Sequence, residues 1–398
     1  MSERIELDKI YTPPVGDLGI IGMRGCEELT EKVNNYLYEG RKALFEQGFT
    51  PSAEAFNDYC RRDYRIKHRC PRFGTGEGKA IVEESVRGRD IFIITDVFNY
   101  GVHYSMYGIE RPMSPDEHFQ DLKRVIGAIE GKARRTNVIM PMLYEGRQHR
   151  RTARESLDCA IMLQELAGLG VDNILTFDAH DSRVCNSIPL HGFENFQTTY
   201  QMIKAIVNNT EDITFSKEDT MIISPDEGGM SRCIFYSESL SVPLGMFYKR
   251  RDYSTIVNGR NPILSHEFLG DSVEGRDVFI VDDMISSGDS VLDIMKQLKA
   301  RKAKRIFVCA SFGLFTSGLD TFDRAYADGL FDRIFCTNLI YRTDALKERK
   351  WFCEVDMSKY IAYIINSLNH DHSLSELLDP HTRIKNFLSN RRLGEFHE

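Results

Sequence analysis

The sequence lacks three patterns that would place it in other classes of protein. Its nine cysteines are scattered, without a Cys-x-x-Cys pair, which predicts reduced thiols rather than a disulfide framework or a zinc site. No run approaches the roughly 18–20 apolar residues of a membrane helix, and the opening MSERIELDKIYTPP has no apolar core of a secretory signal. Lys and Arg number 51 against 59 Asp and Glu, a net charge of −8 that is atypical of a nucleic-acid binder. We therefore expect a cytoplasmic protein that binds neither a membrane nor nucleic acid.

The chain is long enough for two domains, and apolar runs alternate in it with helical patterns. Its 398 residues are 42% hydrophobic and 28% charged, as in ordinary globular proteins. Strands that alternate with helices through short connections predict an α/β fold of mostly parallel sheets flanked by helices. We expect one α/β domain over 1–190, a second over 191–356, and helices over 357–398 that pack back on the first domain. No short internal repeat is evident. The predicted strands are Asp90–Thr95, Asn137–Pro141, Asn173–Asp178, Met221–Ser224, Leu244–Tyr248, Val278–Val281, Arg305–Ala310 and Arg333–Thr337.

The stretch VFIVDDMISSGDSVLDI, residues 278–294, carries the most chemistry. An apolar strand ends at Asp282 and Asp283, a loop rich in serine and glycine follows, and a helix begins near Ser290. The backbone N–H groups of such a loop and of a helix start form a nest for a phosphate. Two carboxylates beside the nest suit ligand hydroxyls or a metal, so a ribose 5-phosphate group fits the stretch. A capped helix start would explain one of these residues but not the aspartate pair.

This stretch resembles the phosphate loop of type I phosphoribosyltransferases and of ribose-phosphate pyrophosphokinases (PRPP synthetases). Five further stretches resemble the second family alone, and they occur in that family's order. The resemblance therefore implies two phosphoribosyltransferase-like domains and a transfer of the diphosphoryl group of MgATP to ribose 5-phosphate. These stretches are FGTGEGKAIVEESVRGRDIFII (73–94), YEGRQHRR (144–151), LTFDAHDSR (175–183), MIISPDEGGMSR (221–232) and MFYKRRDYS (246–254).

The resemblance implies roles for the residues that match the family's motifs. Lys249 and Arg251 match its catalytic cations, at the root of a loop over 252–276 that we expect to act as a lid. His180 and Asp226 match the positions near Mg²⁺, the expected cofactor. The family's ATP-binding positions are Phe73, Glu77, Arg147 and Gln148, and its ribose-5-phosphate positions are Asp226, Asp282, Asp283, Ser286, Ser287, Gly288, Asp289 and Ser290.

In the family, the residues that match Phe73 and Glu77 reach adenine from a neighbouring subunit. We therefore expect a homo-oligomer built from dimers, with a hexamer as one form. Thr75 and His149 depart from the family's motifs, and so do Ser286 and Asp289 in the phosphate loop. Residues 45–70 and 100–115 are insertions to which no role is assigned. Two alternatives stay open: a non-catalytic regulatory relative of a PRPP synthetase, and a phosphoribosyltransferase that consumes PRPP.

Overall fold

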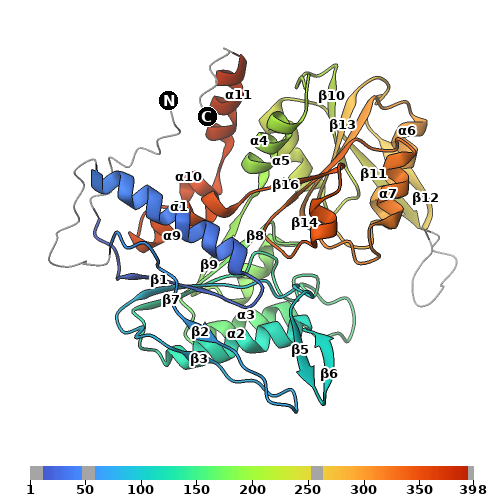
Figure 1. Cartoon of the computed structure of the whole chain (residues 1–398). Helices are drawn as coiled ribbons and strands as arrows, with labels where there is room; N and C mark the ends of the chain where they lie inside the picture. The colour runs from blue at the N-terminus through green and yellow to red at the C-terminus, as the bar shows by residue number, and fades with distance from the viewer. Residues whose placement is uncertain (1–11, 47–58, 252–262, 393–398) are drawn as a thin grey trace.

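The computed structural model describes residues 12–46, 59–251 and 263–392, without the side chains of 249–266 and 391–392. Two separate sheets, each covered by helices, dominate the described chain (Figure 1). The first holds five strands and the second seven. All but one of their strand pairs are parallel, which confirms the predicted α/β class. The boundaries placed at 190 and 356 stay predictions.

The N-terminal sheet has the strand order β1-β4-β7-β8-β9. β9 continues this sheet just beyond the predicted boundary at 190. Two short hairpins extend from the same half: β2 (His68–Arg69) with β3 (Ile81–Val82), and β5 (His103–Met106) with β6 (Ile109–Pro112). The second hairpin forms the 100–115 insertion. The other elements are β1 (Leu18–Gly22), α1 (Glu27–Glu46), β4 (Asp90–Ile94), α2 (Pro115–Ile129), β7 (Arg135–Ile139), α3 (Asp158–Gly168), β8 (Asn173–Phe177), η2 (Ser182–Ser187) and β9 (Gly192–Phe196).

The C-terminal sheet has the order β12-β11-β10-β13-β14-β15-β16, with β12 antiparallel to β11. The prediction that residues 252–276 form one long loop is wrong for residues 263–269, which form β12 and pair with β11. Residues 252–262 lie outside the described chain. The elements are α4 (Thr199–Asn209), β10 (Thr220–Ser224), α5 (Met230–Leu240), β11 (Leu244–Arg251), β12 (Ile263–Leu269), β13 (Asp277–Ile285), α6 (Asp289–Ala300), β14 (Arg305–Gly313), α7 (Asp320–Ala327), β15 (Arg333–Thr337), α8 (Asp344–Lys347) and β16 (Phe352–Val355).

The two sheets are copies of one arrangement, as two domains of one fold predict, and the copies lie too far apart in the chain to form a short repeat. GRDIFIITDVFNYG (88–101) and GRDVFIVDDMISSG (275–288) are identical at seven of 14 positions. The first stretch holds β4 and the second holds β13, and each strand lies second in the parallel run that starts at β1 or β10. The order β1-β4-β7-β8-β9 therefore corresponds to β10-β13-β14-β15-β16.

The copies also share a buried ion pair at the start of the second strand. The guanidinium of Arg135 donates to both carboxylate oxygens of Asp90, at 2.9 and 2.8 Å. Arg305 does the same to Asp277, at 2.9 and 2.5 Å. Each aspartate opens its strand and each arginine opens the next strand. A repeated bidentate pair of this kind fixes the register of both sheets.

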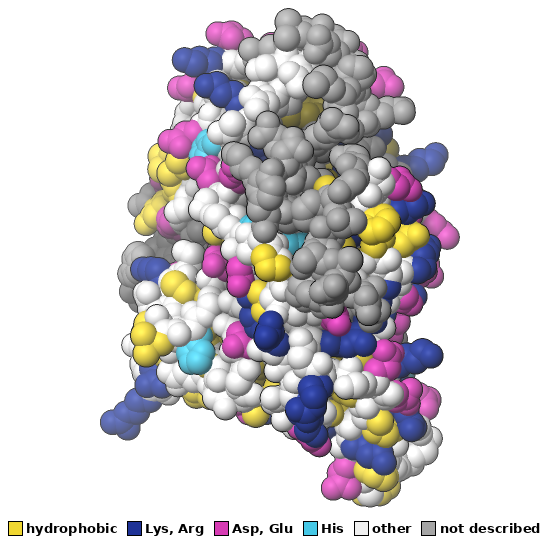
Figure 2. Space-filling view, turned by 90° about the vertical axis from the view of Figure 1, so that its left-hand side faces the viewer, with side chains coloured by type: hydrophobic (Ala, Val, Ile, Leu, Met, Phe, Trp, Pro, Cys, Tyr) yellow, Lys and Arg dark blue, Asp and Glu magenta, His cyan; other side chains and the backbone are white. Residues whose placement is uncertain are grey.

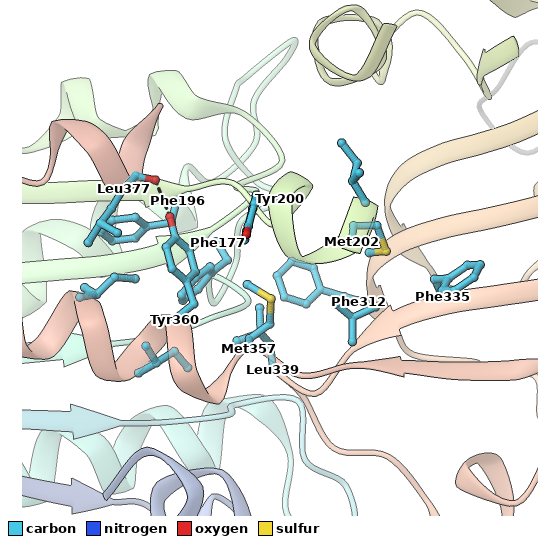
Figure 3. Packing of buried hydrophobic residues seen from close by; sticks show 14 of the residues in the cluster. Phe177, Phe196, Tyr200, Met202, Phe312, Phe335, Leu339, Met357, Tyr360 and Leu377 are labelled. Atoms are coloured by element: carbon cyan, nitrogen blue, oxygen red, sulfur yellow. Dashed lines mark hydrogen bonds between the residues drawn. The ribbon is translucent and has the colours of Figure 1, made fainter. Parts of the chain in front are cut away.

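The helices after β16 return to the N-terminal sheet, where α9 (Ser358–Asn369) packs against α1. α10 (Ser375–Leu378) and α11 (His381–Arg392) follow, and α11 contacts α4 and α5. Buried apolar side chains from both sheets and from α9 form one continuous cluster. Figure 3 shows part of it, with Phe177, Phe196 and Tyr360 on the N-terminal side, Phe312 and Phe335 on the C-terminal side, and Leu339 and Met357 between them.

The surface carries charges of both signs. On the face shown in Figure 2, basic and acidic side chains lie interspersed over the described residues. Within the described ranges, no helix is both long and apolar enough to cross a membrane.

Loss of the Asp90 charge should destabilise the fold strongly. Asp90 is fully buried and also accepts N–H groups from the amides of Asn137 and Asn369, at 2.9 Å each. Asp90→Asn would place an amide against these donors and leave Arg135 without its buried partner. We expect a loss of about 3–5 kcal/mol in the free energy of unfolding, measured with urea. Asp371→Asn is the matched control, because Asp371 also pairs with Arg135 but is 62% exposed; its loss should stay below about 1 kcal/mol.

Candidate active site

The loop after β13 turns sharply into α6, as the sequence predicts. β13 runs on to Ile285, four residues beyond the predicted strand end. Asp282 and Asp283 are therefore part of the strand, near its C-terminal end. Gly288 has a φ of +94°, and a Cβ there would lie 2.3 Å from the ring of Phe322. Only glycine fits this conformation and this space. The turn therefore brings the serine-rich loop under the start of α6.

The Asp289 carboxylate is hydrogen-bonded to the loop and does not line the cavity beside it. Its side chain is exposed and accepts the Ser287 hydroxyl at 2.8 Å. A cavity of about 230 Å³, the loop cavity, lies beside the loop, and Asp289 is not among its walls. A phosphate in this cavity would not meet that carboxylate directly. The loop cavity is lined by His180, Pro225, Asp226, Gly228, Gly229, Arg232, Asp282, Asp283, Met284, Ile285, Ser286, Ser287, Gly288, Ser290 and Val291.

Three carboxylates, those of Asp226, Asp282 and Asp283, line the loop cavity together with Arg232. Burial and the neighbouring Asp283 charge raise the pKa of Asp282. Burial also raises the pKa of Asp283, but the His180 hydrogen bond and the Arg232 charge outweigh it and lower that pKa. Arg232 is largely buried, and its Nε has no hydrogen-bond partner. This Nε lies 3.9 Å from Oδ1 of Asp178, and the Arg232 charge offsets part of that of the aspartates.

His180 reaches the loop cavity from the other sheet. It follows β8, and its Nδ1 lies 2.7 Å from Oδ2 of Asp283. This hydrogen bond raises the pKa of His180. His149 lies beside it, with the two ring centroids 5.3 Å apart and its Nε2 3.5 Å from Asp181. His149, a departure from the family's motif, thus faces an acidic residue in the loop after β8.

A second, larger cavity of about 740 Å³ opens between the two sheets and borders the first. His180, Asp283, Met284 and Ser286 line both cavities. The rest of the interdomain cavity is mostly aromatic and apolar, and Arg147 lies at its wall. The Arg147 guanidinium approaches the Met284 sulfur at 2.8 Å. An elongated ligand could therefore run from Arg147 past His180 to the serine loop.

The predicted residues do not all gather here. Asp226 lines the loop cavity and accepts the N–H groups of Gly228 and Gly229, at 3.0 and 3.3 Å. Phe73 and Glu77 lie in the β2–β3 hairpin loop, away from both cavities; Phe73 is 54% exposed. Gln148 adjoins Arg147 but lines neither cavity.

The two predicted catalytic cations lie at the end of β11, in the strand beside β10. Lys249 pairs with residue 266 and Arg251 with residue 263 of β12. Their side chains lie outside the described part of the chain. Their assigned role stays a prediction.

The possible metal ligands around the loop cavity are few, which suits a cation coordinated mainly by water and by substrate phosphates. Among the described residues, no three His, Cys, Asp or Glu side chains form a metal-binding group. Mg²⁺ commonly keeps several waters and binds proteins through one or two carboxylates plus substrate phosphates. Asp226 and Asp282 offer such carboxylates. His180 uses Nδ1 for Asp283, which leaves Nε2 as the nitrogen that could face a metal.

Two features of the site escaped the sequence analysis. Arg232 is the last residue of the stretch 221–232. Its position in the first turn of α5, directly after the two glycines, could have indicated that it lies at the site. Asp178 directly follows β8 with a φ of +38°, and its carboxylate accepts hydroxyls from Thr198 and from Ser311 of β14. The bond from Ser311 crosses between the sheets, which no local pattern reveals.

Comparisons with known proteins agree with the two-domain arrangement. One family model, the N-terminal domain of ribose phosphate pyrophosphokinase, matches residues 18–170, and another, the phosphoribosyl transferase domain, matches residues 193–334. The ribose-phosphate pyrophosphokinase of Parasynechococcus marenigrum is 28% identical over 275 residues, 68% of this chain and 74% of the relative. That of Mycoplasma pneumoniae is 27% identical over 314 residues, 78% and 87% of the two chains. The crystal structure of phosphoribosylpyrophosphate synthetase from Mycobacterium smegmatis superposes with a TM-score of 0.68 at 19% identity, covering 89% of this chain and 99% of that one. The predicted fold of two phosphoribosyltransferase-like domains is confirmed.

Gly288→Ala should destabilise the protein by more than the backbone strain of an alanine at positive φ, because the added methyl group also clashes with a neighbouring ring. The added methyl group meets Phe322 as well as an unfavourable φ. We expect a loss of roughly 3 kcal/mol or more in the free energy of unfolding. Gly275→Ala is the control: its φ is +75° but no atom lies within 4 Å of the added Cβ, so about 1–2 kcal/mol is expected. Equal losses for both variants would contradict the close approach of Phe322.

Proposed function

Because the chain belongs to the ribose-phosphate pyrophosphokinase family, we propose that it transfers the diphosphoryl group of MgATP to the C1 hydroxyl of ribose 5-phosphate, giving PRPP and AMP. One observation carries the proposal. The serine loop and aspartates of one sheet meet His180 and Arg147 of the other around two joined cavities. A phosphoribosyltransferase would need the serine loop and the aspartates but has no use for His180 and Arg147.

The 5-phosphate binds in the loop cavity, against the backbone and hydroxyls of Ser286, Ser287, Gly288 and Ser290. The absence of Asp289 from the walls of the cavity supports this position. Its carboxylate accepts the Ser287 hydroxyl, which has to turn toward the phosphate when the phosphate binds. Asp282 and Asp283 lie at the strand end beside the loop and take the ribose hydroxyls. Asp226 faces them across the cavity.

ATP occupies the interdomain cavity with its phosphates toward the loop cavity. Arg147 holds phosphate oxygens, since a guanidinium donates to two of them at once. Gln148, next in the chain, supports the same contact. Mg²⁺, when bound with ATP, neutralises phosphate charge, and His180 and Asp226 are the residues that would hold it.

The reaction is a displacement at the β-phosphorus. The C1 oxygen forms a bond to that phosphorus, the bond from it to the oxygen bridging the α-phosphorus breaks, and AMP departs with that oxygen. The hydroxyl proton passes to solvent. Negative charge spreads over the phosphoryl oxygens, where fixed cations stabilise it. Lys249 and Arg251 supply that charge from the end of β11, the strand beside β10.

Phe73 and Glu77 contact adenine from a second copy of the chain. Their position away from both cavities supports a contact in trans. The active protein is then a homo-oligomer built from dimers.

The test mixes the purified full chain with ribose 5-phosphate and MgATP and follows AMP and PRPP by mass spectrometry. Both products in equal amounts are expected. A folded oligomer that forms neither, over a range of divalent metals and phosphate concentrations, would favour the non-catalytic regulatory alternative. Release of diphosphate from PRPP in the presence of a base would favour the phosphoribosyltransferase.

Lys249→Ala should lower kcat by at least about a hundredfold, as loss of a cation that stabilises a transition state does. The KM for ribose 5-phosphate should change little, since its phosphate binds elsewhere. Lys302→Ala is the matched control, because Lys302 is 74% exposed and pairs with Glu274 on the surface. Full activity of the Lys249 variant would exclude its catalytic role.

A further inference from the structure

The N-terminal copy contains a counterpart of the phosphate loop, and two residues of this counterpart, Phe98 and Tyr100, line the interdomain cavity. Asp96 aligns with Asp283 and Gly101 with Gly288 in the repeated stretch. The residues between them have changed, from Met-Ile-Ser-Ser to Val-Phe-Asn-Tyr. The hydroxyls that would hold a phosphate are therefore absent from this copy, while the strand-end aspartate and the glycine are retained.

The retained residues contact Tyr341, which lies in a loop of the C-terminal half. Tyr341, four residues after β15, donates its backbone N–H to Oδ2 of Asp96 at 2.6 Å. The other oxygen of Asp96 accepts the N–H of Phe98 at 3.0 Å. Asp96 is 5% exposed, so these two bonds replace its contact with water.

The Tyr341 ring lies directly over the altered loop. It meets the Tyr100 ring edge-on, with centroids 5.2 Å apart. A Cβ added at Gly101 would lie 2.4 Å from the Tyr341 ring. Glycine at 101 is therefore required by this contact, whereas Gly288 is required by Phe322 of its own domain.

The two copies thus exchange contacts in a reciprocal way. Asp283 of β13 bonds to His180 in the loop after β8, and Asp96 after β4 bonds to Tyr341 in the loop after β15. β4 corresponds to β13 and β8 to β15 in the repeat. One junction carries the proposed chemistry, and the other joins the same two sheets beside it.

We propose that Asp96, Gly101 and Tyr341 form a clasp whose role is to position His180 against Asp283. The phosphate loop of the N-terminal copy has become a docking surface for the C-terminal domain. These three are positioning residues, since none lines the loop cavity. The kinetic consequence rests on the proposed function; the contact itself does not.

Gly101→Ala tests the clasp with one methyl group. Gly101 has an ordinary φ, so the substitution introduces no backbone strain and acts through the Tyr341 ring. We expect faster hydrogen–deuterium exchange at the Tyr341 amide. We also expect kcat/KM for ribose 5-phosphate to fall at least about tenfold, since small displacements of reacting groups are expensive. Gly127→Ala is the control, because nothing lies within 4 Å of its added Cβ; both readouts should match the wild type.

The double variant Gly101→Ala/Tyr341→Ala should recover. Removal of the ring relieves the clash while the backbone N–H of residue 341 still reaches Asp96, so kcat/KM should return to within about threefold of the wild type. If each substitution only damaged the structure, the loss of kcat/KM caused by Tyr341→Ala would add to the loss caused by Gly101→Ala. If Gly101→Ala does not fold, Asp96→Asn replaces it, because an amide cannot accept both N–H groups.

Three outcomes would overturn the clasp: unchanged amide exchange in Gly101→Ala, faster exchange with an unchanged kcat/KM, or a double variant no better than the single one. Should the wild type form no AMP, the proposed function fails. Amide exchange at residue 341 in Gly101→Ala and in the double variant, with Gly127→Ala as the control, still decides whether the clasp exists.

Discussion

The hydrogen bond between His180 and Asp283 is the contact on which the site depends. At 2.7 Å it joins the loop after β8 to the end of β13, and so joins the two sheets at the point where their cavities meet. Asp283 is nearly buried, so its charge needs this partner and Arg232. Because the donor and acceptor come from different domains, neither half of the chain contains the site alone.

The charges around this contact explain how one site can hold both an anion and a cation. Burial beside Asp283 raises the pKa of Asp282, whereas the His180 hydrogen bond and the Arg232 charge lower the pKa of Asp283. The serine loop contributes donors without charge. A sugar phosphate can therefore approach from the loop side while a cation with its own phosphate ligands meets the carboxylates.

The sequence predicted the parts of the structure that rest on local patterns. All eight proposed strands are present, since each is an apolar run between turn residues, and the loop at 282–290 has the strand–loop–helix form that its serines and glycine indicate. β12 was missed because its stretch 263–269, which mixes apolar and polar residues, was assigned to one long loop; in the structure it pairs with β11. Arg232, Asp178 and Tyr341 were missed because their partners lie in the other sheet. The repeat was visible in the sequence, but only at an offset spanning half the chain.

A double-mutant cycle on His180 and Asp283 tests the central claim most directly. His180→Gln, Asp283→Asn and the double variant would be compared by kcat/KM for ribose 5-phosphate in the presence of MgATP. If the two residues act as one unit across the domain junction, the double variant should be no more than about threefold worse than the more impaired single variant. Losses that multiply would show that the two residues act independently and would contradict a site assembled through their contact.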